Sequence, residues 1–404
     1  MRSAACLSVL ASSILFAFSA TADAAKPAAQ YWMSVSTENM TVPGMEAAGG
    51  GGLEGMLGSM AMKGMGVGGG QNRTMFLDLL GPDTPASPSA EHLIPPGLKM
   101  GASLPLVTPT PRGGTDVEGE AKREDIKILL YWGCGETVRM GQPRVLDTAK
   151  MSPEDYGSVL VSRGGGHRFR LSPRKGWTYG DWPNREKPVP VPEDGSLVGE
   201  HLIKGNYTPD IKFALDERRD FMAPVVFTKA EGGLADAVKT EWKSIPTAIG
   251  YFMMATGGSE QRKEVVVWTS SEVADMGGGL LTYLPNATVQ KYIQQKVVFG
   301  PKVTQCTIPK GIFSKADGAA VQFIAYGDEA NFAYPPKPAD PKAKWEPIWT
   351  AKVRLKSMGM LPLGVEGGAT AAESSGKTEK PKEESSPVDS AVEGVKKLKG
   401  LFGF

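Results

Sequence analysis

The sequence predicts an all-β protein, and three observations lead to that expectation. The chain has 404 residues, of which 50 are glycine and 31 proline, a composition typical of short strands joined by turns. Apolar, β-branched and aromatic runs recur at short intervals, and several alternate with polar residues. Helical periodicity is scarce before the C-terminal end. We therefore expect two antiparallel β-sandwich domains, over residues 26–227 and 228–363.

The first 25 residues have the features of an export signal. Arg2 precedes an apolar run from Leu7 to Ala20, and small residues follow as far as Ala25. This run is too short to cross a bilayer comfortably. We expect residues 1–25 to be a signal peptide that is removed, which places the mature protein in the periplasm or at the cell surface. Membrane association stays open.

The expected strands follow one another through both domains. The last of them, residues 349–357, alternates clearly: positions 351, 353 and 355 are apolar, whereas the positions between them are Lys352, Arg354 and Lys356. That pattern predicts one buried and one polar face. The expected strands are residues 30–36, 74–80, 126–132, 143–148, 158–162, 167–172, 210–215, 223–228, 248–255, 264–270, 280–284, 296–300, 319–327 and 349–357.

The two expected domains share an internal similarity. Aligning Trp132 with Trp268 without a gap also aligns Glu136 with Glu272, and the apolar runs before each tryptophan coincide. Such self-similarity indicates an internal duplication. It predicts that the two domains have similar folds.

The sequence KTEWKSIPTAIGYFMM combines a tryptophan, a short proline-containing turn and a tyrosine. Trp242, Ile245, Ala248 and Tyr251 hold the positions that would pack together. The segment, about residues 239–270, resembles the B-to-C strand region of fibronectin type III and related bacterial immunoglobulin-like sandwiches. That resemblance implies a two-sheet antiparallel fold used mostly for spacing and binding, with these four side chains in its core.

Signal-peptide removal leaves two cysteines, Cys134 and Cys306, in an oxidising compartment. Their distance in the sequence does not say whether their side chains meet. Two alternatives therefore stay open: a disulfide that closes a long loop, or two buried thiols that pack as small apolar groups.

Three aromatic residues, Trp177, Tyr179 and Trp182, lie close together among charged residues. Exposed rings with a polar fringe can stack on sugar rings or on a partner protein. Alternatively, the rings turn inward and cap the first sandwich. We treat the three as candidate binding residues, with carbohydrate as a candidate ligand.

A methionine-rich segment offers a candidate metal site. Met56, Met60, Met62 and Met65, together with His92, could present soft ligands to Cu(I), which prefers thioether sulfur. Alternatively, the methionines fill gaps or cover the sandwich as a loose apolar helix. Copper is thus the only cofactor that the sequence suggests.

The C-terminal end differs from the rest of the chain. Residues 364–387 contain almost no apolar side chain and predict a disordered linker. Residues 388–404 place apolar side chains at three- and four-residue steps, which predicts an amphipathic helix. Such a helix can bind an envelope protein or an anionic membrane surface, or it can fold back onto its own domains.

Charge and motif content restrict the function. The 45 basic and 44 acidic residues leave a formal net charge of +1, so we expect no nucleic-acid partner. The chain has three histidines in separate contexts and no Gly-x-Ser-x-Gly motif. We expect an exported, non-enzymatic envelope protein that binds or scaffolds a partner through its β-sandwich loops and C-terminal helix. Periplasmic copper handling and a hydrolase with an unrecognised site are the alternatives.

Overall fold

The computed structural model describes residues 27–40, 72–109, 125–152, 163, 170–183, 189–259, 261–340 and 342–364. Strands form 46% and helices 8% of this part of the chain, which confirms the all-β class. Among the residues described, no helix combines the length and apolar character needed to cross a membrane. The expected signal peptide and C-terminal helix lie outside these residues, as does all of the expected linker except Gly364.

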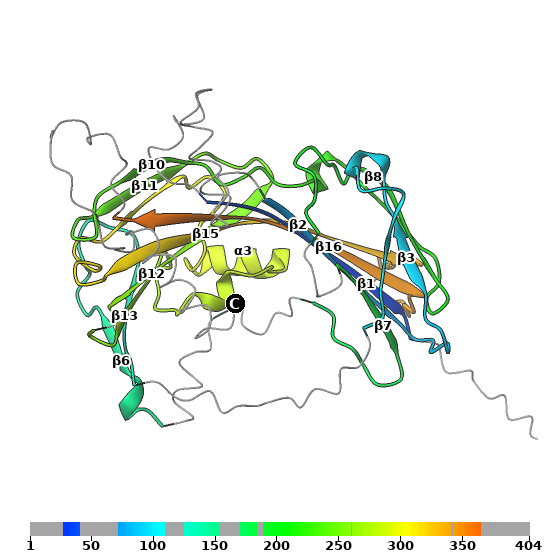
Figure 1. The fold of residues 1–404 in the computed structure, drawn as a ribbon, viewed down its shortest axis with the longest axis horizontal. Helices are drawn as coiled ribbons and strands as arrows, with labels where there is room; N and C mark the ends of the chain where they lie inside the picture. The colour runs from blue at the N-terminus through cyan, green and yellow to red at the C-terminus, as the bar shows by residue number, and fades with distance from the viewer. Residues whose placement is uncertain are drawn as a thin grey trace, which may run out of the picture.

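One nine-stranded sheet organises the molecule (Figure 1). Its strands are β1 (Ala29–Met40), β2 (Asn72–Gly81), β5 (Lys127–Trp132), β6 (Arg144–Asp147), β7 (Thr178–Trp182), β12 (Ala248–Ser259), β13 (Glu264–Thr269), β15 (Gly318–Tyr334) and β16 (Trp349–Leu363). The strand order is β6-β5-β13-β12-β15-β16-β1-β2-β7. β5 pairs with β13 and β1 with β16 in parallel, and all other neighbours in this sheet are antiparallel.

Two small sheets and one helix complete the described fold. One sheet has the order β4-β3-β8-β9, with strands β3 (Ala90–Leu93), β4 (Ser103–Pro105), β8 (Gly199–Gly205) and β9 (Ile211–Leu215). The other has the order β10-β11-β14, with strands β10 (Phe227–Glu231), β11 (Val238–Trp242) and β14 (Gln305–Ile308). Helix α3 (Asn286–Gln294) lies on the opposite side of the long sheet from β10 and β11 (Figure 1). Short 3₁₀ turns occupy Pro96–Leu98, Thr148–Lys150, Glu217–Arg219 and Gly278–Leu280.

The main core fills the space between the long sheet and the two small sheets. Alternate side chains of β1 enter it, and Tyr31 and Val35 are at most 1% exposed. The Tyr31 ring lies 6.0 Å from that of Phe213 on β9. Toward the other end, Trp242 of β11 lies 4.9 Å from Phe323 of β15. Burial of each such ring stabilises the fold by about 1.5–3 kcal/mol relative to exposure.

A second core lies on the other face of the sheet, beneath α3. β12 contributes to both cores: Tyr251 and Met253 enter the main core, whereas Phe252 and Met254 enter the second core. Val289 of α3 is fully buried against this second group. A strand buried on both faces reads as a continuous apolar run rather than as an alternation. The run Gly-Tyr-Phe-Met-Met is therefore a central strand.

The long sheet does not divide at the expected domain boundary. β13, which lies in residues 228–363, is inserted between β12 and β5, and β5 belongs to residues 26–227. β1 and β16 pair along their length in the same way. Two separate β-sandwich domains would have separate sheets, so the two-domain sandwich is not confirmed: one sheet combines strands of both segments. The internal duplication stays a prediction.

The four residues behind the fibronectin-like resemblance do pack together. Trp242, Ile245, Ala248 and Tyr251 are all less than 10% exposed, and the Trp242 and Tyr251 rings lie 6.0 Å apart. The backbone N–H of Ile245 donates a 3.0 Å hydrogen bond to the Tyr251 hydroxyl. These contacts explain the sequence pattern, whereas the resemblance itself stays a prediction.

Candidate functional site

The three aromatic residues proposed for binding do not form one exposed surface. Tyr179 and Trp182 are 4% and 6% exposed, and strand alternation places them on opposite faces of β7. Trp182 enters the main core. Trp177 is partly exposed and packs beneath the Arg174 guanidinium, 5.0 Å from its ring centroid. The expected stacking surface is therefore corrected, because two of its rings are buried.

His92 belongs to a buried chain of hydrogen bonds. The Tyr31 hydroxyl lies 2.9 Å from Nδ1 of His92, and Nε2 of His92 lies 2.9 Å from Nδ1 of His201. Nε2 of His201 lies 2.7 Å from the Leu197 carbonyl oxygen. Both imidazoles are completely buried.

The terminal carbonyl fixes the direction of this chain. A carbonyl only accepts, so His201 Nε2 carries a proton and donates to Leu197. In the neutral tautomer, His201 Nδ1 then accepts from His92 Nε2, and His92 Nδ1 accepts from Tyr31. Burial lowers the pKa of both histidines, which favours these neutral forms.

The copper hypothesis gains no support from His92. Both of its ring nitrogens are engaged in buried hydrogen bonds, so a metal would have to displace one of them. Met56, Met60, Met62 and Met65 lie outside the described residues. Within the described part of the chain, no group of three or more His, Cys, Asp or Glu side chains is placed to hold a metal ion.

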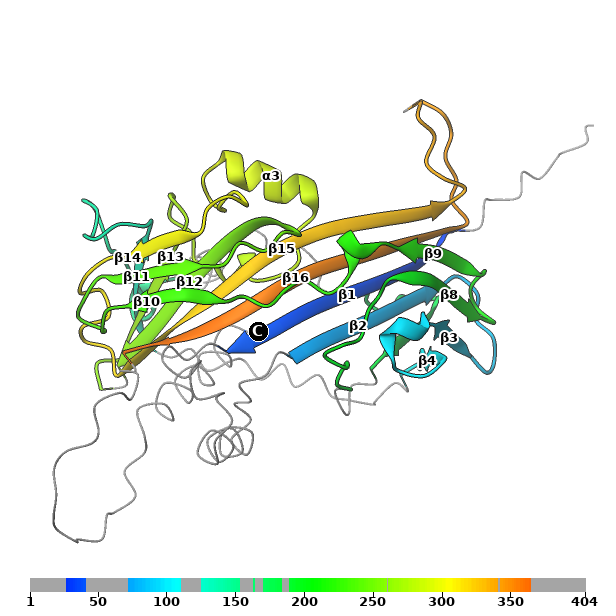
Figure 2. The same ribbon diagram turned by 90° about the horizontal axis from the view of Figure 1, so that it is seen from above.

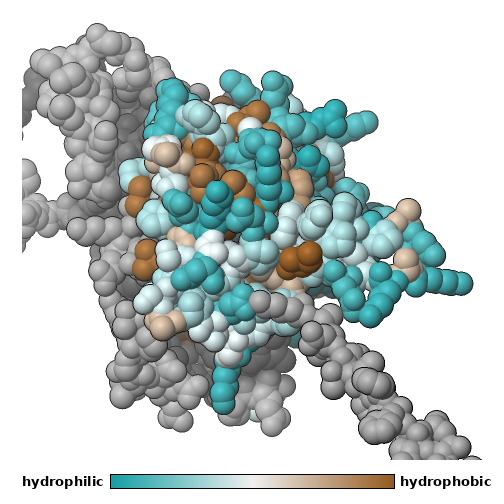
Figure 3. Space-filling view, turned by 90° about the vertical axis from the view of Figure 1, so that its right-hand side faces the viewer, coloured by the Kyte–Doolittle hydropathy of each residue, from teal (hydrophilic) through white to brown (hydrophobic). Residues whose placement is uncertain are grey.

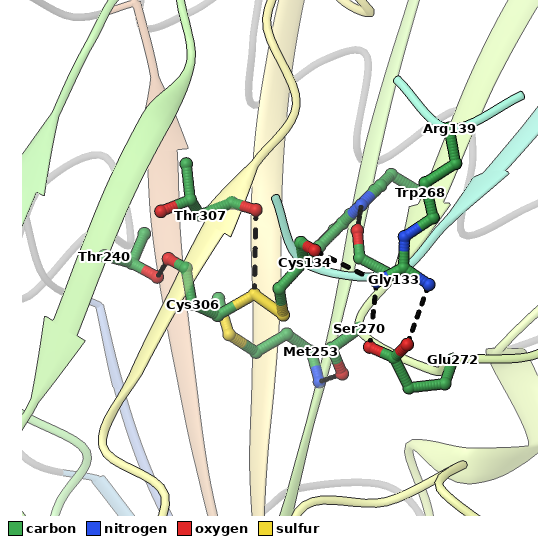
Figure 4. Close-up of a disulfide and its surroundings, with 10 residues drawn as sticks. All are labelled: Gly133, Cys134, Arg139, Thr240, Met253, Trp268, Ser270, Glu272, Cys306 and Thr307. Atoms are coloured by element: carbon green, nitrogen blue, oxygen red, sulfur yellow. Dashed lines mark hydrogen bonds and ion pairs between the residues drawn. A yellow bond between two sulfur atoms is a disulfide. The ribbon is translucent and has the colours of Figure 1, made fainter. Parts of the chain in front are cut away.

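Cys134 and Cys306 form a disulfide (Figure 4). Cys134 lies in the loop after β5 of the long sheet, and Cys306 lies in β14 of the three-stranded sheet. Thr240 of β11 donates a 2.7 Å hydrogen bond to the Cys306 carbonyl. The disulfide therefore ties the two sheets together at one end of the main core.

An arginine clamp surrounds the disulfide loop. Arg139 makes a two-pronged contact with Glu272, at 2.7 and 3.1 Å, and also donates to the Cys134 carbonyl (Figure 4). Gly133, whose φ of +86° suits glycine, accepts a hydrogen bond from the Trp268 indole N–H. A Cβ at Gly133 would lie 2.5 Å from the Arg139 guanidinium carbon. The contacts position the loop.

The side of the long sheet away from the small sheets carries a group of polar residues, here called the polar face. They come from alternate positions of β1, β2, β7 and β16, so they share one side of the sheet. The members are Trp32, Ser34, Ser36, Glu38, Asp78, Tyr179, Asp181, Lys352, Arg354 and Lys356.

Cations and aromatic rings alternate along β16 on the polar face. Trp32 lies beneath both Lys352 and Arg354, with their charged groups 5.4 and 4.5 Å from its ring centroid. Tyr283 lies beneath both Arg354 and Lys356, at 4.9 and 4.8 Å. Cation–π contacts contribute about 0.5–2 kcal/mol each, more where the cation is desolvated. The rings thus stabilise three cations held two residues apart on one strand.

Beside this ladder, two carboxylates share one guanidinium. Asp78 and Asp181 are directly opposite each other on β2 and β7, and both are at most 1% exposed. Arg170 contacts Asp78 at 2.9 Å and Asp181 at 3.1 Å. The Tyr179 hydroxyl donates to Asp78 at 2.5 Å. Burial raises the pKa of Asp78, although Tyr179 and Arg170 oppose that shift.

The loop between β15 and β16 projects beyond the sheet (Figure 2). It covers residues 335–348, of which 341 lies outside the described residues. At its base, Tyr334 and Ile348 are 56% and 50% exposed, and the Ile348 N–H donates to the Tyr334 carbonyl at 2.7 Å. The Tyr334 ring stacks 6.3 Å from Trp349. Two large apolar side chains are therefore exposed at the base of the loop.

The projecting loop is held in shape by its own contacts. The Trp345 indole N–H donates a 3.0 Å hydrogen bond to the Pro335 carbonyl. Lys337 lies over the Trp345 ring, 5.9 Å from its centroid. Hydrophilic residues dominate the end of the molecule seen in Figure 3, with apolar residues in small groups.

The polar face and the projecting loop were both missed as sites by sequence reasoning. The alternation in residues 349–357 does place the cations of β16 on one side, which Lys352, Arg354 and Lys356 confirm. Nothing in the sequence indicates that Trp32 and Tyr283 lie beneath them, because those contacts depend on strand order. The loop of residues 335–348 could have been predicted from its prolines, which lie between two apolar runs of the sequence.

No protein-family model matches the chain, and neither the curated proteins nor the solved structures contain a significant match.

Proposed function

We propose that the protein is an exported, non-enzymatic binding protein that presents the loop of residues 335–348 to a partner protein. The observation that carries this proposal is that Tyr334 and Ile348 are both exposed at the base of a projecting loop, where their backbones are hydrogen-bonded. Large apolar groups facing solvent together are typical of interaction sites. Loops longer than about 12 residues are often functional.

Two features support export. The apolar segment within residues 1–25 follows the order of a signal peptide. The Cys134–Cys306 disulfide fits an oxidising compartment, because cytosolic thiols are kept reduced. Together they favour the periplasm or the cell surface.

The two strands that carry the loop, β15 and β16, are suited to presenting it to a partner. β15 and β16 have 17 and 15 residues, and they pair with each other up to Tyr334 and Trp349. Their other ends enter both cores. A loop on such a base loses little conformational freedom on binding, which favours affinity.

The loop composition indicates the chemistry of the partner. Its tryptophan and prolines, with Tyr334 at its base, provide rigid apolar area, and its three lysines outnumber its one aspartate and one glutamate. Aromatic residues are enriched at the energetic centre of protein interfaces. We therefore expect an envelope protein with an apolar groove bordered by acidic residues.

The test is a pull-down from an envelope extract, quantified by mass spectrometry. The bait is the mature chain, compared with the double variant Tyr334→Ser/Ile348→Ser. A matched control, Met140→Ser/Val145→Ser, removes exposed apolar groups elsewhere, since Met140 and Val145 are 102% and 49% exposed.

We expect at least one protein that the wild type and the control retain and that the loop variant loses by about tenfold or more. All three baits should unfold at similar urea concentrations, because surface substitutions usually change stability by about 0.5 kcal/mol or less. Equal recovery on the loop variant and the wild type would contradict the proposal.

Other hypotheses from the sequence stay proposals. Residues 388–404 can add a second contact, to an envelope protein or a membrane surface. A fibronectin-like origin and an internal duplication fit the adjacent parallel pairing of β5 with β13. The copper-handling hypothesis is now supported by the methionine-rich segment alone. No particular group of described residues supports the hydrolase hypothesis.

A further inference from the structure

Lys356 lies at the boundary between the polar face and the second core, and its side chain is partly exposed. Its neighbour on β1 is Ser36, and its neighbour on β15 is Tyr326. Tyr326 belongs to the second core and donates a hydrogen bond to the Leu280 carbonyl. Lys356 therefore borders a buried aromatic residue, and the residue as a whole is partly exposed.

Two lysines on the same face of β16 differ in their partners. Lys352 contacts the Glu329 carboxylate at 3.0 Å. Lys356 makes no ion pair or hydrogen bond through its amine within the described residues, and its nitrogen lies 4.8 Å from the centroid of the Tyr283 ring. Lys352 and Lys356 thus lie on the same face of β16, but only Lys352 forms an ion pair among the described residues.

Burial and a neighbouring cation favour a neutral amine at Lys356, whereas the Tyr283 ring beneath it favours the charged form. Burial lowers the pKa of Lys356 to about 8; the Glu38 carboxylate on β1 opposes this shift, and the Arg354 guanidinium adds to it. Tyr283 and Tyr326 face it as uncharged phenols, because burial raises the pKa of both hydroxyls. The Ser36 hydroxyl is 2% exposed and has no hydrogen-bond partner within the described residues.

This environment resembles that of activated lysines in general. A desolvated lysine next to another cation loses its proton more easily and becomes a nucleophile. At pH 7.5, an amine with a pKa of about 8 is roughly one-quarter neutral, whereas an ordinary lysine with a pKa of about 10.4 is roughly 0.1% neutral.

We propose that Lys356 is a carbonyl-reactive amine, at which a small aldehyde becomes attached as an imine. The Nζ lone pair attacks the carbonyl carbon and forms a C–N bond. The carbonyl oxygen takes up the two protons of the amine and leaves as water, so no oxidant or reductant is needed. The partnerless hydroxyl of Ser36 is positioned on the same face as a hydrogen-bond partner for the oxygen during addition.

The test is reductive methylation of the folded chain with formaldehyde and sodium cyanoborohydride at pH 7.5, followed by peptide mass spectrometry. The initial rates of labelling at Lys356 and Lys352 are compared in the same sample. We expect Lys356 to react at least about tenfold faster, because more of its amine is neutral. The variant Lys356→Arg should abolish this label and leave the rate at Lys352 unchanged.

A second variant tests the electrostatic origin of the reactivity. Glu38→Gln removes the charge that opposes deprotonation, so the pH profile of Lys356 labelling should shift to lower pH. The unchanged labelling of Lys352 serves as the internal control for folding. Labelling of Lys356 at or below the rate of Lys352, or a profile centred near pH 10, would overturn the proposal.

Discussion

At the scale of single residues, the buried polar groups of this protein are held in defined states by their neighbours. The Leu197 carbonyl sets the tautomer of His201, which in turn sets that of His92. A proton added to Nδ1 of His201 would place two N–H groups opposite each other, and one added to Nδ1 of His92 would face the proton of the Tyr31 hydroxyl. Because both rings are fully buried, water cannot relieve that conflict.

Acid should therefore destabilise the fold through this histidine pair. The pKa values of His92 and His201 are lowered in the folded chain, whereas an unfolded histidine has a pKa of about 6.5. Below that pH the unfolded state binds more protons, so stability decreases as the pH falls toward the folded pKa values. We expect the free energy of urea unfolding to fall by about 1–3 kcal/mol between pH 7.5 and pH 5.5 from this pair.

NMR provides the control for this prediction. The chain has three histidines, so at most three imidazole signals need assignment. In the folded protein, the signals of His92 and His201 should titrate below the unfolded value of about 6.5. Titration of either ring near pH 6.5 would show that the neutral chain of hydrogen bonds is not maintained.

Single-residue roles were the least predictable from the sequence. His92 was proposed as a metal ligand because a histidine near methionines suits copper, but its partners Tyr31 and His201 come from distant strands. The sequence did not determine whether the side chains of Tyr179 and Trp182 are exposed or buried. Their burial depends on the position of β7 in the sheet. Such contacts depend on strand order, which local patterns do not contain.

At the scale of elements, the disulfide reinforces a contact that backbone hydrogen bonds also make, since the Gly135 N–H donates to the Thr307 carbonyl at 2.9 Å. It links the loop after β5 to β14, across 172 residues of sequence. Thr240 and the Arg139 clamp hold its surroundings in place. A cross-link over such a long loop restricts the unfolded chain strongly.

Replacing both cysteines, Cys134→Ser/Cys306→Ser, should lower the free energy of unfolding by about 2–5 kcal/mol. The measurement is urea unfolding followed by tryptophan fluorescence. Dithiothreitol should produce a similar loss in the wild type and no further loss in the double variant. Equal stability of oxidised and reduced wild type would contradict this role of the disulfide.

Strands with strong apolar patterns were predictable, whereas short or polar elements were not. The alternation in residues 349–357 and the run in residues 248–255 correspond to β16 and β12. α3 was missed because Val289 is its one buried residue, which leaves little periodicity. Residues 296–300 form no strand, because they pack beside β12 with only the bridge between Phe299 and Tyr251.

At the scale of the whole molecule, the described strands form one interleaved unit. β13 lies between β12 and β5, and β1 lies between β16 and β2. Neither residues 26–227 nor residues 228–363 contain the whole nine-stranded sheet: β12, β13, β15 and β16 come from the second segment and its other strands from the first. The domain boundary was predicted from a sequence similarity between adjacent strands, and such similarity carries no information on which strands pair.

Separate production of residues 26–227 and 228–363 should therefore give two chains without native tertiary structure. Each would leave strands of the long sheet without neighbours and half of the main core exposed. The measurement is near-ultraviolet circular dichroism, with the intact mature chain as the control. A cooperative urea transition in either half alone would contradict the single-unit description.

The pairing of the first described strand with the last one has a consequence for synthesis. Ala29 on β1 is the partner of Trp349 on β16, and Ser34 accepts a hydrogen bond from Arg354 across 320 positions of the chain. During translation, β1 leaves the ribosome long before its partner exists. Edge exposure during that interval invites aggregation. The edge of β1 that pairs with β16 therefore stays open until nearly all of the chain has been made.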